Sequence, residues 1–310
     1  MDTKEQRLVR ITESQYHNPY VRRLRPRDIP CQYENYEVFP GWQIILMAEI
    51  PGSDGAPSRR FDAKDLAMYA EHFRGQGYYV FIDGMEELIS KDYLRALIPT
   101  DQKVITCSGC LIAEKPALID DLREAEISTV GINYDFDVHG RLQKCPIYEA
   151  KIALDIAKLR FRTRVITTVT KPYLEKLPEY CEWCASNGYP EILFKNFIQQ
   201  SNARELDDLI LSAEDRKRYF EIITSLRAKY PIEALRISSS GSFGACGTAN
   251  MCCTSMRDSV VLTPDLKIYP CTYMMQKGME CGYYMGGYIY TLNNFNMPRD
   301  DCLARTIYNG

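Results

Sequence analysis

Several features are scarce or missing in this chain of 310 residues, and each absence excludes a class of protein. Only three histidines occur, and they are scattered and form no set of metal ligands: His17, His72 and His139. No run approaches the roughly 18 apolar residues that a membrane-spanning helix needs. The formal net charge of −3 provides no basic surface for nucleic acid. No Ser/His/Asp arrangement, P-loop or dinucleotide-binding fingerprint is present. We therefore expect neither membrane insertion nor nucleic-acid binding.

The N-terminal segment and the cysteine content indicate the compartment. Met1–Arg7 is polar and predicts no secretory signal peptide. The chain nevertheless contains 12 cysteines. In a reducing compartment, metal binding is a more common role for cysteine than disulfide formation. We expect a cytoplasmic protein in which some cysteines bind metal.

The middle of the chain alternates short apolar runs with helical patterns. The runs predict buried strands at Trp42–Ile50, Tyr78–Ile82, Lys103–Thr106, Ser128–Asn133, Arg164–Val169 and Glu191–Phe194, and a last strand at Glu233–Ile237. Helices are expected between them, near 62–74, 90–98, 116–126, 147–159, 173–185 and 214–229. Such a series of βα units with short links indicates a parallel sheet, open or curled toward a barrel. Loops at the carboxyl ends of the strands are then where chemistry is expected.

Half of the cysteines lie near the C-terminal end of the chain. Cys246, Cys252 and Cys253 precede a β-hairpin pattern, and Cys271 follows it. The hairpin is indicated by two β-rich runs around Thr263-Pro264-Asp265, a turn with proline at its second position. Because a hairpin of this kind returns one cysteine toward an earlier cluster, we interpret the tail as a metal or iron–sulfur site.

A pair with the spacing Cys-x2-Cys follows the third predicted strand. Cys107 and Cys110 lie at the end of the sheet where chemistry is expected. Together with Cys145 and Cys31 they are candidates for a second metal site, because two-residue spacing is a ligand geometry. The alternative is a pair of free thiols in a tight turn.

A second pair with this spacing has a different context. Cys181 and Cys184 lie in a helical run, where positions i and i+3 share one face. That face also carries Leu177 and Tyr180, so we expect the two thiols to pack in the core. A redox pair would instead open a helix, where the helix dipole lowers the thiol pKa.

The order of these units and several short motifs resemble a radical S-adenosylmethionine (SAM) enzyme with a C-terminal SPASM or twitch extension. Gly84 and Glu86 fall where the family has its second-strand motif Gly-Gly-Glu-Pro-Leu. Gly131–Asp135, followed by His139, is similar to the fourth-strand motif Ile-Ser-Leu-Asp and the histidine after it. The resemblance covers about residues 42–290. It implies an α/β fold, a partial (β/α)6-type barrel with a small cysteine-rich C-terminal extension.

The resemblance also implies a cleft for SAM, lined by four residues at strand ends: Gly84, Glu86, Asn133 and Asp135. The family's signature, Cys-x3-Cys-x2-Cys after the first strand, holds the iron–sulfur cluster that cleaves SAM. It occurs nowhere in this chain. The loop after the first strand, residues 51–60, contains no cysteine, and its Ser, Asp and Arg side chains cannot replace thiolates as ligands of iron. We therefore expect that conventional cleavage of SAM is lost.

For the tail, the resemblance implies an auxiliary [4Fe–4S] cluster of the SPASM type. Its expected ligands are four cysteines: Cys246, Cys252, Cys271 and Cys281. Cys253 is an alternative to Cys252, and Cys302 is an alternative to Cys281. We expect three parts in the chain, an N-terminal arm (1–40), a radical-SAM-like partial barrel (41–240) and the cysteine-rich module (241–310).

Three functions remain open at this point. The first is a partner or scaffold in peptide modification that binds a peptide substrate, a leader peptide or a catalytic partner protein. The basic stretch Arg22–Arg27 suits an acidic leader. The second is an active peptide-modifying enzyme that uses an unconventional cluster at Cys107 and Cys110 or a non-radical reaction in the same cleft. The third, a structural zinc module on an unrelated α/β domain, needs only the tail cysteines, and the sequence assigns no catalytic residue.

Overall fold

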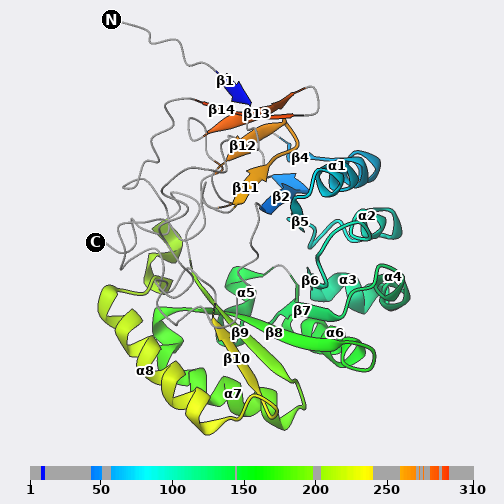
Figure 1. Cartoon of the computed structure of the whole chain (residues 1–310). Coiled ribbons are helices and arrows are strands. Elements are labelled where there is room, and N and C mark those ends of the chain that lie inside the picture. Colours follow the sequence, from blue (N-terminus) through cyan, green and yellow to red (C-terminus); the bar gives the residue numbers. More distant parts are fainter. Residues whose placement is uncertain are drawn as a thin grey trace, which may run out of the picture. The chain divides into compact units, whose positions relative to one another are not determined.

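The structure, a computed structural model, divides by its contacts into two compact units (Figure 1). It describes residues 8–10, 43–50, 57–143, 145–197, 204–239, 259–269, 272, 275, 280–285 and 288–292. Among these residues, no helix combines the length and the apolar character that a bilayer crossing requires.

The first unit joins segments from both ends of the chain: Met1–Gly84, Pro99–Asp101 and Met251–Cys302. Its seven-stranded sheet has the order β1-β14-β13-β12-β11-β2-β5. The strands are β1 (Leu8–Arg10), β2 (Gln43–Met47), β5 (Tyr79–Asp83), β11 (Ser259–Leu262), β12 (Lys267–Tyr269), β13 (Gly282–Met285) and β14 (Tyr288–Leu292). A short antiparallel pair, β3 (Glu49–Ile50) and β4 (Arg59–Arg60), completes the strands of this unit.

The predicted hairpin of the tail is confirmed, and it extends the sheet of the first predicted strand. The turn closes with a 2.9 Å hydrogen bond from the Leu266 N–H to the Thr263 carbonyl. β11 and β12 are antiparallel, whereas β11 runs parallel to β2, with Val260 opposite Ile44. Both of these side chains are buried, so apolar contacts between distant parts of the sequence support the pairing.

Helix α1 (Ala63–Gly75) begins and ends where the sequence predicts. Its N-cap, Asp62, accepts a 2.8 Å hydrogen bond from the backbone N–H of Asp65. This contact satisfies one of the free donors at the helix start. Leu66, Ala70 and Phe73 are buried, which is the spacing of one helix face packed on a sheet.

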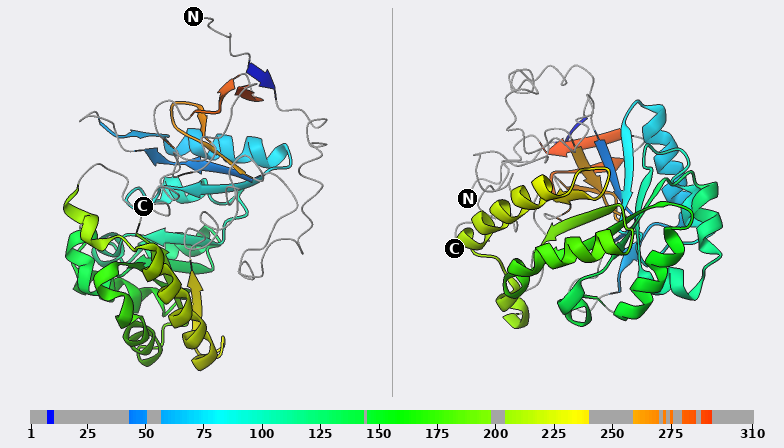
Figure 2. Two further views of the ribbon diagram at one scale, coloured as in Figure 1. Left: turned by 90° about the vertical axis from the view of Figure 1, so that its left-hand side faces the viewer. Right: turned by 90° about the horizontal axis from the view of Figure 1, so that it is seen from below.

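The second unit comprises Met85–Ile98, Gln102–Asn250 and Leu303–Gly310 and contains a parallel sheet with the order β10-β9-β8-β7-β6. Its strands are β6 (Val104–Cys107), β7 (Thr129–Asn133), β8 (Arg162–Val169), β9 (Glu191–Asn196) and β10 (Arg236–Ser239). A strand order that follows the sequence, with right-handed crossovers, places the connecting helices on one face. Helix α6 (Ile147–Ala157) contacts β7 and β8, α7 (Leu177–Ser186) contacts β9, and α8 (Ala213–Lys229) contacts β10. Figure 2 shows these strands and helices, green to yellow, from two further sides.

Shorter helices fill the connections of the second unit. They are α2 (Lys91–Arg95), α3 (Gly109–Glu114), α4 (Leu118–Glu124), α5 (His139–Leu142) and the 3-10 helices η4 (Phe136–Val138), η5 (Lys171–Lys176) and η6 (Arg204–Leu209). The single helix expected over 173–185 is divided between η5 and α7, because Pro178 lies at a helix start. The last strand begins at Arg236, since Ala234 and Leu235 donate to the Pro231 carbonyl and form a turn.

Candidate functional site

The candidate site lies along the edge of the parallel sheet at which the described strands end. β6, β7, β8 and β9 are parallel neighbours, so their carboxyl ends lie at one edge. Two buried polar atoms in the loops after these strands have no hydrogen-bond partner among the described residues: His139 Nε2 and Thr170 Oγ1. Since buried polar groups are almost always paired, such atoms mark this edge as a place where a ligand would be accommodated.

Asp135, one of the predicted SAM-cleft residues, joins the loop after β7 to β8. Its side chain is 2% exposed. One carboxylate oxygen accepts a 2.6 Å hydrogen bond from the backbone N–H of Thr168, and the other accepts one of 2.9 Å from Gln143 Nε2. Both oxygens are therefore engaged within the protein, and a contact of this carboxylate with SAM stays a prediction.

His139 has a defined tautomer because of its contact with the same loop. Its Nδ1 accepts a 3.1 Å hydrogen bond from the backbone N–H of Asp135, so Nε2 carries the proton of the neutral ring. The residue is 2% exposed, and it lines a pocket of about 310 Å³. Asp137, Gln143 and Cys145 also line this pocket. A buried donor without a partner among the described residues thus borders a cavity that has both polar and apolar side chains in its walls.

Aromatic packing fixes the segment that carries Asp135 and His139. Tyr134 stacks on Trp183 with ring centroids 4.7 Å apart, and Phe136 stacks on Tyr180 at 4.0 Å. The Tyr180 hydroxyl donates a 2.8 Å hydrogen bond to Asp137. Burial, with the Asp137 carboxylate, raises the pKa of Tyr180. The strand exit is therefore a rigid scaffold against helix α7.

A cluster of two thiols and one carboxylate lies between α3 and α6. The ligand atoms of Cys110, Cys145 and Glu149 all lie within 4.8 Å of one another. Cys110 is in α3, Cys145 immediately precedes the N-cap of α6, and Glu149 is in the first turn of α6. We refer to these three residues as the thiol–carboxylate cluster.

The sequence brings this cluster together through a close helix contact. A Cβ on Gly109 would lie 2.6 Å from the Cα of Ala150, so only glycine allows α3 to approach α6 at this point. Cys110 follows Gly109, and Glu149 precedes Ala150, which places their side chains beside the contact. The Ser108 N-cap starts α3, so the segment begins a helix and is not the tight turn of the alternative interpretation. Cys107 and Cys110 are free thiols, as that interpretation predicts.

The electrostatic surroundings of the cluster disfavour free thiolates. Burial raises the pKa of Cys110, and its hydrogen bonds with Cys145 and Glu149 raise it further. Burial also raises the pKa of Cys145, where the carboxylates of Glu149 and Glu87 act in the same direction. Both thiols therefore hold their protons at neutral pH unless a cation compensates the charge.

Cys107 does not share the environment of Cys110. It ends β6 with a side chain that is 0% exposed, and burial together with Glu86 raises its pKa. Among the described residues it belongs to no cluster of three or more ligand-type side chains. Cys107 and Cys110, which their spacing suggested as a pair of metal ligands, therefore do not form a site together, and Cys110 lies with Cys145 and Glu149 instead. Cys31, the remaining candidate, lies outside the described residues.

The second cysteine pair is confirmed as part of the core. Cys181 and Cys184 of α7 are both 0% exposed. Burial raises the pKa of Cys181 to about 12 and raises that of Cys184 as well. Thiols in this state are inert at neutral pH.

The remaining residues of the predicted SAM cleft lie at strand ends. Gly84 follows β5 with a φ of +71°, and a Cβ there would lie 2.8 Å from Met47 Sδ, so glycine is required. Glu86 is half-buried, and its carbonyl accepts a 3.3 Å hydrogen bond from the Ser108 N–H. Asn133 ends β7 and is half-buried. Their contact with SAM remains a prediction.

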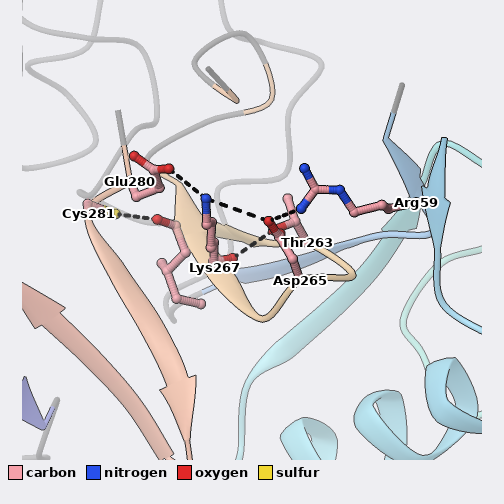
Figure 3. Close-up of polar contacts among 7 residues, drawn as sticks. Arg59, Thr263, Asp265, Lys267, Glu280 and Cys281 are labelled. Atoms are coloured by element: carbon pink, nitrogen blue, oxygen red, sulfur yellow. Dashed lines mark hydrogen bonds and ion pairs between the residues drawn. The ribbon is translucent and has the colours of Figure 1, made fainter. Parts of the chain in front are cut away.

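Only Cys281 of the four expected auxiliary-cluster ligands lies in the described part of the chain. It is 0% exposed, and its Sγ donates a 3.3 Å hydrogen bond to the Ile268 carbonyl (Figure 3). Beside it, Lys267 contacts Glu280 at 2.8 Å and Asp265 at 3.7 Å. The other expected or alternative ligands lie outside the described residues: Cys246, Cys252, Cys253, Cys271 and Cys302.

Whether a SAM-cleaving cluster fits this chain depends on which side chains are available as ligands of iron. Three thiolates are needed to hold such a cluster, and soft iron is not held by hydroxyl, carboxylate and guanidinium groups in their place. The segment 51–60 after β3 contains no cysteine. The residues present therefore do not fit the family's catalytic cluster.

Comparison with solved structures identifies the fold. SuiB from Streptococcus suis bound to S-adenosylmethionine matches with a TM-score of 0.58 and 14% identity over 77% of this chain and 62% of SuiB. SuiB bound to the precursor peptide SuiA matches with a TM-score of 0.53 and 14% identity over 74% of this chain and 59% of that one. Native anSMEcpe with bound AdoMet and Cp18Cys peptide matches with a TM-score of 0.60 and 13% identity over 79% and 77%.

These likenesses, at low identity, establish the fold. The chain therefore has an α/β fold like that of SuiB and anSMEcpe, with a parallel sheet and the partial barrel that was expected. It spans less than two thirds of SuiB. No protein-family model matches the chain, and no curated protein matches it by sequence.

Proposed function

We propose that this chain is a radical-SAM-type protein of peptide modification that acts without conventional SAM cleavage, as a peptide-binding partner or scaffold. The observation that carries the proposal is the combination of this fold with the missing Cys-x3-Cys-x2-Cys motif. The scaffold is retained, whereas the thiolates that would hold the SAM-cleaving cluster are absent.

A peptide, a leader peptide or a catalytic partner protein is the proposed binding partner. SuiB has been solved with the precursor peptide SuiA, and anSMEcpe with the peptide Cp18Cys. Arg22–Arg27 supplies positive charge for an acidic leader. The unpartnered donor of His139, beside its pocket, suits an acceptor such as a peptide carbonyl.

The tail, residues 241–310, is proposed to hold an auxiliary iron–sulfur cluster. Cys246, Cys252, Cys271 and Cys281 are its proposed ligands, in a module that follows an N-terminal arm and the partial barrel. The β11–β12 hairpin supports this proposal, since its antiparallel strands place Tyr269, two residues before Cys271, opposite Val261. Such a cluster would supply electron transfer or structural stability.

The decisive experiment measures SAM cleavage by the reconstituted protein. The full chain is purified anaerobically, reconstituted with iron and sulfide, reduced and incubated with SAM, and 5′-deoxyadenosine is quantified. We expect no product above a blank without protein. A radical SAM enzyme with the intact motif, treated identically, serves as the positive control. Turnover to 5′-deoxyadenosine would overturn the proposal and favour an active enzyme with an unconventional cluster.

Metal analysis separates the auxiliary cluster from a zinc module. One [4Fe–4S] cluster gives about four iron and about four sulfide per chain. We expect these to be lost in Cys246→Ala and Cys271→Ala and kept in Cys107→Ala. Zinc without sulfide in the tail would contradict the iron–sulfur assignment.

A further inference from the structure

We propose that the thiol–carboxylate cluster, Cys110, Cys145 and Glu149, binds a thiophilic divalent cation, with zinc as the expected occupant. The three ligand atoms lie within 4.8 Å of one another. Zinc bonds thiolate at about 2.3 Å and carboxylate oxygen at about 2.1 Å, so ligand atoms around one tetrahedral ion lie about 3.5–3.8 Å apart. Small rotamer movements are therefore sufficient to bring the three atoms to one ion.

The backbone holds the three ligands in place. Cys145 and Glu149 flank the start of α6, whose N-cap is Pro146, a residue with a fixed φ. Cys110 comes from α3, which meets α6 where Gly109 allows the two backbones to touch. Ligands on two helices in direct contact lose little conformational entropy when an ion binds.

The chemistry of the donors selects the ion. Two sulfur ligands favour zinc and similar soft cations over magnesium or calcium, which prefer oxygen ligands only. Once an ion has displaced the two thiol protons, the carboxylate completes a set of three anionic ligands. Glu87 adds a fourth negative charge that acts on Cys145. A divalent cation would compensate this accumulation of negative charge.

Three protein ligands leave one coordination position open, as in catalytic rather than structural zinc sites. Cys145 also lines the pocket of about 310 Å³ that His139 borders. The open position would therefore be taken by water or by a donor atom of a small ligand that enters this pocket. This proposal is independent of the proposed auxiliary cluster, because none of its residues is a tail cysteine.

The first test uses the unaltered full chain and reads each thiol separately. The reduced protein is alkylated with iodoacetamide with and without zinc, and peptides are quantified by mass spectrometry. At a zinc concentration tenfold above the dissociation constant, we expect alkylation of Cys110 and Cys145 to slow about tenfold. Cys181, which is buried and inert, is the internal control: it should stay unmodified in both samples, which shows that the fold is intact. Equal alkylation of Cys110 and Cys145 in both samples would overturn the proposal.

The second test compares zinc binding by variants within the cluster and by a variant elsewhere in the chain. Cys110→Ser/Cys145→Ser is expected to bind one zinc equivalent fewer than the parent in competition with a chromophoric chelator. Cys181→Ala, which removes a thiol elsewhere, is expected to bind the parental number. Glu149→Gln should lower the affinity about tenfold, because a neutral amide replaces an anionic ligand. Circular dichroism confirms that each variant is folded, and a double variant with parental zinc content and affinity would refute the site.

Discussion

Gly109 lies against Ala150 with no space for a side-chain carbon, since a Cβ on Gly109 would be 2.6 Å from the Cα of Ala150. This contact sets the separation of α3 and α6. It therefore controls both the packing of the second unit and the geometry of the thiol–carboxylate cluster.

Gly109→Ala is expected to lower the free energy of unfolding by about 1–3 kcal/mol, because the added methyl group forces two backbones apart. Urea denaturation followed by circular dichroism measures the change. Gly75→Ala is the matched control, since a Cβ at Gly75 meets nothing within 4 Å, and its effect should stay within about 1 kcal/mol. Equal stability of Gly109→Ala and the parent would show that α3 can shift without cost.

Asp135→Ala is expected to destabilise the protein by about 1–3 kcal/mol, since it removes a buried carboxylate and leaves the half-buried N–H of Thr168 without its acceptor. Asp135→Asn keeps one carbonyl oxygen and should cost less. Asp120→Ala, an exposed aspartate in α4, is the control and should change the free energy of unfolding by no more than about 0.5 kcal/mol. If Asp135→Ala behaved like Asp120→Ala in chemical denaturation, the carboxylate would not hold the loop after β7.

Asp155 gives the protein a defined sensitivity to acid. Burial raises the pKa of this carboxyl, but hydrogen bonds from Lys151, Lys158 and Tyr189 outweigh that effect and lower it to about 2. The unfolded carboxyl has a pKa of about 4, so the stabilisation is present above pH 4 and is lost as the pH falls toward 2. Because the side chain is 40% exposed, solvent screening limits the contribution to about 1 kcal/mol.

Asp155→Asn should therefore be less stable than the parent at pH 7 and equally stable near pH 2. Unfolding curves at a series of pH values measure this convergence. A difference between the two proteins that stays constant from pH 7 to pH 2 would mean that the carboxylate charge is not the cause.

Cys281 and Cys302 compete for the fourth position of the proposed auxiliary cluster, and single variants distinguish them. We expect Cys281→Ala to reduce iron and sulfide content after reconstitution, while Cys302→Ala leaves both unchanged. The Sγ of Cys281 donates to the Ile268 carbonyl, so ligation requires the thiol to give up this hydrogen bond. Loss of iron in Cys302→Ala alone would assign the ligand to Cys302 and leave Cys281 as a core residue.

Local sequence patterns were sufficient to predict most elements of the fold. Short apolar runs mark β2, β5 and β6 to β9, because buried strands of a parallel sheet need apolar side chains on both faces. The Asp62 cap predicts the start of α1 for an equally local reason. Helix α3 was missed because Ser108 and Gly109 are typical turn residues, whereas here serine is the N-cap and glycine provides a helix contact.

The candidate site was harder to predict from the sequence than the fold, because it is formed by contacts between residues that are far apart in the chain. Cys110 and Cys145 were recognised as possible ligands from their places after strands. Glu149 was not, since its proximity to Cys110 depends on the approach of Gly109 to Ala150. The pairing of β11 with β2 was likewise not predictable, because parallel register is set by packing between segments far apart in the chain.

The pairing of Val260 with Ile44 also bears on the order in which the chain folds. The parallel strands of the second unit lie within one continuous stretch, so they can associate as soon as the ribosome has released them. The first unit must wait, since β2 is synthesised early and its neighbour β11 more than 200 residues later. Contacts of such high sequence separation form slowly. During synthesis the edge of β2 stays exposed until β11 emerges, and such an open strand edge is a point where incomplete chains are prone to aggregate.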